Sequence, residues 1–333
     1  TGVLELAVDE GHFAEPLSEL ALEPADAFAI DGLRLRLRDS GLGVPLVATR
    51  RSAPEPHAYA LVRKLPVTAF LRLEGGLAEL AHGLRARLEL HSGHDLSSVE
   101  VAGRAVPLET DRSVALARAL DDRSVWSFSV RGLFHGESAE QQNRLILAQP
   151  YARGRVPVVF VHGTYSSPAY WAEMFNSLWA DPELRRSCQM WFFQYTTGNP
   201  VAYSAAELRD ALQATVAELD PEGSDEALRN MVLIGHSQGG LLVRLAVGGC
   251  EIATLEELSG HRLEELALAP EDEAMLRRCF EFEPLAGVTR AIFLCTPHGG
   301  SFLSRRWYSR LIGKLISFPG DVLTAGSSIL SNV

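Results

Sequence analysis

The sequence predicts an α/β protein, in which residues 151–333 form a mostly parallel sheet and residues 1–150 form a smaller β-rich, sandwich-like domain. Short apolar runs in the second half alternate with helix-length amphipathic segments, the pattern of βαβ units whose strands are buried on both faces. The first half has alternating runs that end in turn residues. The composition, 47% hydrophobic and 22% charged, is sufficient for a globular core.

Period-2 alternation locates the strands of the first half. LRLRLR (residues 33–38) alternates strictly, which predicts a strand with one buried face. Further strands are predicted at VTAFLRLEGG (67–76), LRARLELHSG (84–93) and SVWSFSVRG (124–132). DRSVALARALDD (111–122) predicts one short helix.

In the second half, continuous apolar runs predict buried strands. They are VPVVFVHG (156–163), QMWFFQY (189–195), NMVLIGHS (230–237) and TRAIFLCTP (289–297). Residues 204–219 have the 3–4 apolar spacing of a helix, with Ser204 as the expected N-cap. The charged insertion at about 251–285 is a candidate lid.

Charge and hydropathy limit the partners. The net charge of −11 and the absence of a basic stripe exclude nucleic acid. No run approaches the roughly 18 apolar residues of an integral membrane segment. Because the chain starts at Thr1, we expect a removed upstream segment, and we favour a secreted, periplasmic or lipid-anchored protein over a cytoplasmic one. The sequence indicates no particular oligomeric state.

The cysteines show no metal-ligand spacing. Cys295, in an apolar run, is expected to be a buried thiol. Cys250 and Cys279 either form a bridge across the segment between them or remain thiols.

GHSQG, residues 235–239, is the chemical centre of the sequence. It lies between the apolar run MVLI and a helix-like segment. This context is typical of a sharp strand-to-helix turn that exposes a nucleophile, and such a turn needs very small residues on either side of the nucleophile. Ser237 is therefore the candidate nucleophile. Its neighbour Gln238 would supply one backbone N–H to an oxyanion hole.

A second oxyanion donor is expected from the loop after a neighbouring strand. VPVVFVHGT ends in His162, Gly163 and Thr164, 73 residues before Ser237. Gly163 allows the turn that would direct the Thr164 N–H into the site. An ordinary glycine turn after a buried strand is the alternative interpretation.

These motifs resemble those of bacterial lipases and esterases of the α/β-hydrolase superfamily. VFVHGT, IGHSQGG and FLCTPHGGS occur in the same order as in that superfamily, over residues 150–333. The resemblance implies an α/β-hydrolase fold, Ser237 as nucleophile and the N–H groups of Gln238 and Thr164 as oxyanion donors. It also implies that His162 and His236 have structural or site-shaping roles.

The acid and base of a triad are missing from the expected places. In such hydrolases they follow the nucleophile, acid first. After Ser237 the only histidines are His261, in the candidate lid, and His298, at the end of a strand beside the nucleophile strand. His298 is the candidate base and Asp321 a weaker candidate acid. We expect the true pair, an Asp and a late Gly-His, to lie beyond Val333 in a longer chain.

The predicted function is hydrolysis of carboxylic esters, as an esterase or lipase, through an acyl-enzyme on Ser237. The substrate would be a small-molecule or lipid ester, and the reaction needs no metal or organic cofactor. Tyr165, Tyr170 and Trp171 follow the oxyanion loop and are candidate walls of an apolar substrate pocket. Alternatives are a non-catalytic hydrolase-like binding module, favoured by the missing base, or an acyltransferase or thioesterase with the same nucleophile.

Overall fold

The chain alternates between two structural units. The computed structural model describes residues 4–9, 17–30, 33–51, 57–74, 84–94, 98–121, 143–265 and 268–299. The first unit contains Thr1–Glu55, Leu61–Val125 and Ala172–Arg186. The second unit contains Pro56–Ala60, Trp126–Trp171 and Ser187–Val333. The single domain boundary near residue 150 stays a prediction.

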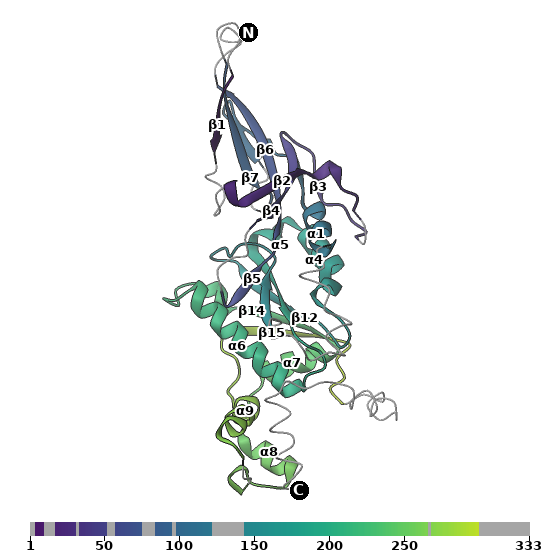
Figure 1. Ribbon diagram of the computed structural model, residues 1–333, viewed down its shortest axis with the longest axis vertical. Helices are drawn as coiled ribbons and strands as arrows, with labels where there is room; N and C mark the ends of the chain where they lie inside the picture. The colour runs from purple at the N-terminus through teal and green to yellow at the C-terminus, as the bar shows by residue number, and fades with distance from the viewer. Residues whose placement is uncertain are drawn as a thin grey trace. The chain divides into compact units, whose positions relative to one another are not determined.

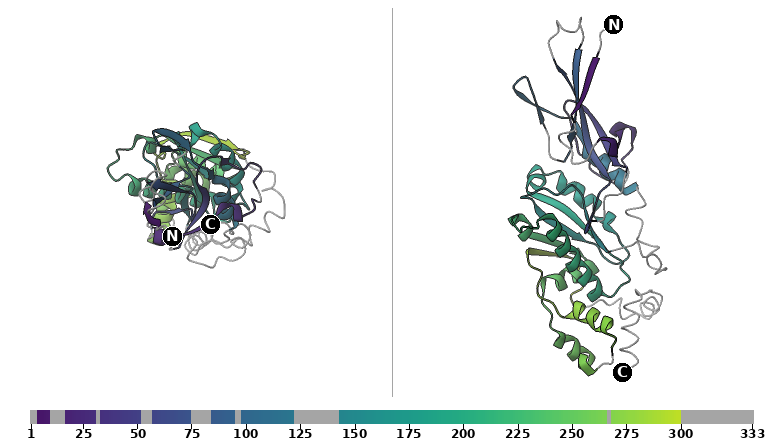
Figure 2. Two further views of the ribbon diagram at one scale, coloured as in Figure 1. Left: turned by 90° about the horizontal axis from the view of Figure 1, so that it is seen from above. Right: turned by 60° about the vertical axis from the view of Figure 1, so that its left-hand side comes forward.

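A five-stranded sheet, ordered β1-β7-β6-β4-β2, organises the first unit. Its strands are β1 (Leu4–Asp9), β2 (Leu20–Pro24), β4 (Val44–Arg50), β6 (Lys64–Glu74) and β7 (Leu84–Ser92). β1 runs parallel to β7, and the other pairs are antiparallel. β6 and β7 confirm the strands predicted at 67–76 and 84–93, and they lie side by side in Figures 1 and 2.

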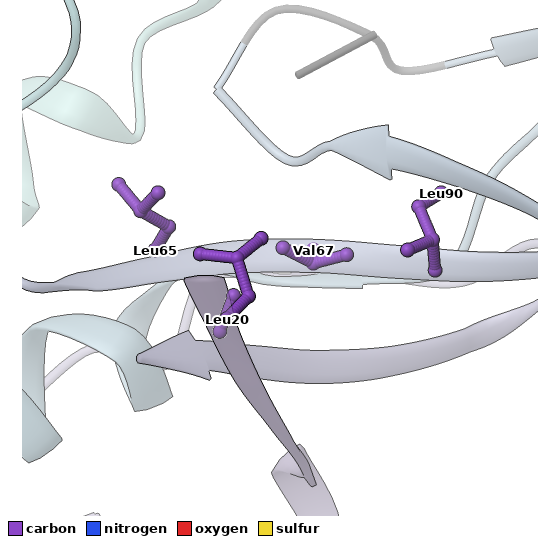
Figure 3. Packing of buried hydrophobic residues seen from close by; sticks show 5 residues of the cluster. Leu20, Leu65, Val67 and Leu90 are labelled. Atoms are coloured by element: carbon purple, nitrogen blue, oxygen red, sulfur yellow. The ribbon is translucent and has the colours of Figure 1, made fainter. Parts of the chain in front are cut away.

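The predicted helix is also present, as α1 (Arg112–Asp121). Its Val114 and Ala115 pack with Val47 of β4. Because successive strand residues point to opposite faces, Ala48 lies on the other face. There it joins a second cluster, drawn in Figure 3, with Leu20, Leu65, Val67 and Leu90. A helix thus covers one face of this sheet, where a sandwich would place a second sheet, so the sandwich-like description was wrong for the described residues.

The smaller elements of the first unit are β3 (Arg38–Asp39), β8 (Ser98–Val101), β9 (Arg104–Pro107), β10 (Thr110–Asp111), α4 (Ala172–Trp179) and most of α5 (Pro182–Ser187). The strand predicted at 33–38 was wrong, because only Arg38 enters a strand. The Leu37 N–H donates to Ser113 Oγ at 2.8 Å, and the Leu35 carbonyl accepts from Asn176 Nδ2 at 2.6 Å. Side chains therefore bind backbone groups that a neighbouring strand would otherwise pair.

The second unit contains a six-stranded sheet in the order β15-β14-β12-β13-β11-β5. Its strands are β5 (Tyr59–Leu61), β11 (Arg144–Leu147), β12 (Val156–Val161), β13 (Cys188–Gln194), β14 (Met231–His236) and β15 (Val288–Leu294). β12 to β15 confirm the four predicted strands and pair in parallel, whereas β11 is antiparallel to β13. The expectation that all four are buried was wrong for β15, in which no residue is buried and Ile292 is 43% exposed. β5 and β11 come from the part of the chain before residue 150 and were not predicted.

Two helices pack against each other beside this sheet, α6 (Val201–Leu219) and α7 (Gln238–Val247), as Figure 1 shows. α7 packs on β14 and β15, and α6 on β11. The N-cap of α6 is Pro200, and Ser204 is buried in the first turn with its N–H bonded to the Pro200 carbonyl. The expectation that Ser204 caps this helix was therefore wrong.

The insertion after α7 folds into α8 (Ile252–Ser259) and α9 (Pro270–Phe280), which pack on each other. Its role as a lid stays a prediction. Cys250 and Cys279 are both free thiols, and the bridge between them is not formed. Cys295 is exposed, contrary to expectation, because it lies just past the end of the outer strand β15.

Some predicted features lie outside the described residues, namely the strand at 124–132 and Asp321. Within the stretches that the structure describes, no helix has the length and hydrophobicity needed to cross a membrane.

Candidate active site

Ser237 occupies a strained turn between β14 and α7. Its φ of 53° and ψ of −120° lie in a region of backbone conformation that residues other than glycine avoid. Ser237 is the N-cap of α7, yet its side chain makes no capping hydrogen bond. The hydroxyl of this half-buried serine is therefore not used to cap its own helix, and the positive end of the helix dipole adjoins it.

Three glycines make this turn sterically feasible. A Cβ on Gly235 would stand 2.5 Å from the Gly240 Cα. One on Gly239 would stand 2.3 Å from the Val161 carbonyl oxygen, and one on Gly240 would be 1.8 Å from Thr296 Oγ1. Real Cβ atoms do not approach this closely, so packing requires glycine at all three positions.

The turn is held by the neighbouring strand. The Ser237 N–H donates to the Leu294 carbonyl of β15 at 2.8 Å, and the Gly240 N–H donates to the Ser237 carbonyl at 3.1 Å. Both backbone groups of Ser237 are thus engaged, so the strained conformation is fixed from two sides.

The loop after β12 lies against the turn. A Cβ on Gly163 would be 2.9 Å from Ser237 Cβ and 3.1 Å from the His236 carbonyl oxygen. The next residue, Thr164, donates from Oγ1 to Gln238 Oε1 at 2.5 Å. The structure therefore brings together the three residues predicted as nucleophile and oxyanion donors.

A third loop reaches the same place. The Gln238 side chain donates from Nε2 to the Thr197 carbonyl at 3.3 Å, and the Tyr165 N–H donates to Thr197 Oγ1 at 3.4 Å. Thr197 follows β13 and was not predicted. The signal was available: β13 neighbours β12 in parallel, so the loops after both strands leave the same edge of the sheet, and TTGNP follows β13.

His162 is enclosed at the start of the loop after β12. It is buried, its ring stacks on Tyr195 at 4.5 Å, and its Nδ1 donates to the Gly163 carbonyl at 3.1 Å. Burial lowers the pKa of His162 to about 4. The Tyr195 hydroxyl donates to the His162 carbonyl at 2.8 Å, and burial raises the pKa of this tyrosine. A neutral, enclosed imidazole does not suit proton transfer near pH 7.

The three predicted pocket residues differ in exposure. Tyr165 and Tyr170 are 53% and 66% exposed, whereas Trp171 is buried. The Tyr170 ring stacks on His236 with centroids 5.6 Å apart, and Trp171 meets the same imidazole edge-on at 6.3 Å. Tyr170 and Trp171 therefore surround the residue before Ser237, while Tyr165 is held at a φ of 58° beside Thr197.

His298 lies in the turn after β15. It is exposed, its ring packs edge-on against Phe293 at 4.8 Å, and its N–H donates to the Thr296 carbonyl at 3.0 Å. Among the described residues, no hydrogen bond joins its imidazole to Ser237. The described part of the chain also holds no group of three His, Cys, Asp or Glu side chains arranged for a metal ion.

Comparison with solved structures finds a Bacillus licheniformis lipase, BlEst2, in two forms. The propeptide form is 19% identical with a TM-score of 0.30, over 50% of this chain and 30% of the lipase chain. The mature form is 18% identical with a TM-score of 0.29, over 56% of this chain and 63% of the lipase chain. The chain thus spans less than two thirds of either lipase. No curated protein matches the chain.

Residues 158–327, half of the chain, match a protein family. The match begins in β12 and includes the turn at Ser237 and all of β15. The chain belongs to the alpha/beta hydrolase family.

Proposed function

We propose that this protein is a serine hydrolase of carboxylic esters, an esterase or lipase that works through an acyl-enzyme on Ser237. The observation that carries the proposal is the strained Ser237 turn with the oxyanion loop packed against it. Strain of this kind persists only where the surrounding structure fixes it, and it concentrates at functional sites.

In the proposed reaction, Ser237 Oγ attacks the ester carbonyl carbon and its proton passes to a base. The carbonyl oxygen becomes an oxyanion that accepts hydrogen bonds from the N–H groups of Gln238 and Thr164, each worth about 3–4 kcal/mol in such sites. The alcohol leaves with a proton, and water then cleaves the acyl-enzyme to release the acid. Tyr165, Tyr170 and Trp171 form the apolar wall beside the acyl or alcohol group.

His298 is kept as the candidate base, because it follows the strand next to β14 at the same edge of the sheet. A His298→Gln variant should then lose most turnover without losing its fold. Turnover equal to the wild-type protein would exclude His298.

A fluorophosphonate probe tests the nucleophile. We expect the full-length protein to be labelled at Ser237, and Ser237→Ala to abolish labelling. The matched control is Ser177→Ala, which removes the hydroxyl of an exposed serine on α4 and should leave labelling intact. A folded full-length protein that is neither labelled nor active on esters would argue for the non-catalytic binding module. Product analysis with competing alcohols would distinguish hydrolysis from acyl transfer.

A further inference from the structure

We propose that the side chain of Gln238 is a positioning residue that holds the two oxyanion donors at a fixed separation. The inference rests on the proposed function, which gives the donor role to the backbone N–H groups of Thr164 and Gln238. Its new element is the Gln238 carboxamide, which joins three loops that are separate in sequence.

The carboxamide uses both of its ends. Its Oε1 accepts from Thr164 Oγ1 at 2.5 Å, and its Nε2 donates to the Thr197 carbonyl at 3.3 Å. A carbonyl oxygen can only accept, so the NH₂ group must face Thr197 and the amide oxygen must face Thr164. The orientation of the side chain is thus set by chemistry.

Thr197 also makes a direct hydrogen bond to the oxyanion loop. Its Oγ1 accepts the N–H of Tyr165, the residue after Thr164, at 3.4 Å. Tyr165 has a φ of 58°, which the loop can keep only if it is fixed in place. Thr164 is therefore restrained through its own side chain and through the backbone of the next residue.

The exposure of the loop explains why such a restraint matters. Thr164 is exposed and Tyr165 is 53% exposed, so packing alone restrains them little. Gln238 lies in the first turn of α7, a rigid element. An oxyanion donor is effective only when it is positioned before charge develops, and displacement of one donor costs about 100-fold or more in turnover. The carboxamide therefore restrains the position of Thr164, in an exposed loop, relative to the first turn of α7.

Four variants of the full-length protein test this inference. Gln238→Leu removes both polar ends but keeps the backbone N–H, and Thr164→Val removes the hydroxyl but keeps the shape. We expect each to lower kcat by about 10-fold or more while KM changes less than about 2-fold, because only the transition state carries the oxyanion. Thr164→Ser restores the hydroxyl and should recover most of kcat. The double variant Thr164→Val with Gln238→Leu should fall no further than the worse single variant, since both break the same link.

Gln213→Leu, on an exposed position of α6, is the matched control and should retain wild-type kcat. Melting temperatures of all variants establish that the fold is kept. Unchanged kcat in Gln238→Leu would overturn the inference, and so would losses in the two single variants that multiply in the double variant. Neither result would affect the proposed function, which is judged by labelling and turnover of the wild-type protein.

Discussion

Gly163 packs directly against Ser237, with 2.9 Å between the Ser237 Cβ and the position that a Cβ on Gly163 would occupy. The same added atom would stand 3.0 Å from His236 Nδ1 and 3.1 Å from the His236 carbonyl oxygen. The loop after β12 and the turn at Ser237 therefore meet without space for a methyl group. This close approach connects two residues that are 74 positions apart in sequence.

Gly163→Ala should lower kcat by roughly 10-fold to 100-fold, because the new methyl group pushes the Thr164 N–H away from the oxyanion. Steady-state kinetics with a soluble ester measures the change. Gly249→Ala is the control, since a Cβ there meets atoms only at ordinary contact distances of 3.4 Å or more. Full turnover in Gly163→Ala would mean that this loop does not supply a donor.

Gly240→Ala should destabilise the fold by about 3 kcal/mol, the upper end for overpacking, because its Cβ would overlap the Thr296 side chain. Adding Thr296→Ala removes the overlapping Oγ1 and Cγ2 atoms and should recover part of the loss. Gly239→Ala meets backbone carbonyls of Val161 and His162, so Thr296→Ala should not rescue it. Denaturant unfolding measures the stability of Gly240→Ala and of Gly239→Ala, each with and without Thr296→Ala. If Thr296→Ala restored the same stability to both glycine variants, this geometry would be contradicted.

Ser237→Gly should be more stable than Ser237→Ala, although both lack the nucleophile. Glycine relieves a φ of 53° that costs an L-residue about 1–3 kcal/mol, against roughly 0.5–1 kcal/mol of added chain entropy. In the helix position Ser177, the order should reverse, with glycine less stable than alanine. The thermal unfolding temperatures of the four variants test this order. If the alanine variant were more stable than the glycine variant at both positions, the backbone of Ser237 would not be strained.

Stability should fall as the pH decreases from about 6.5 to about 4. In the folded protein, burial lowers the pKa of His162 to about 4. Between pH 6.5 and pH 4 the unfolded chain therefore binds a proton at His162, whereas the folded chain does not. The loss amounts to roughly 3 kcal/mol. Above pH 6.5 the full contribution is present.

His162→Phe keeps an aromatic ring against Tyr195 but cannot be protonated. The free energy of unfolding of this variant, measured by denaturant at several pH values, should lack the part of the slope that His162 contributes. An identical slope in both proteins would contradict a buried, neutral His162.

The strand-to-helix turn at Ser237 was predictable because its requirements are local. Gly235, Gly239 and Gly240 flank Ser237 within six residues, and each position leaves no space for a side chain. The parallel strands were equally predictable, since β12 to β14 are buried along most of their length and their residues are almost all apolar. In both cases, neighbouring residues in the sequence specify the structure.

Features that depend on distant residues were missed. LRLRLR has the alternation of a strand, but Ser113 and Asn176, over 70 and 140 residues away, take its hydrogen-bonding groups. The carboxamide of Gln238 depends on Thr197 in the same way. β5 and β11 were missed because short strands carry little periodicity, and their place in the sheet is set by pairing alone.

The hydrogen bond from the Ser237 N–H to the Leu294 carbonyl couples the proposed nucleophile to β15, the outermost strand of the described sheet. Leu294 is the last residue of β15, so its carbonyl fixes the Ser237 turn from outside β14 and α7. A change at the end of β15 therefore reaches the backbone of Ser237 through a single hydrogen bond, without passing through β14 or α7.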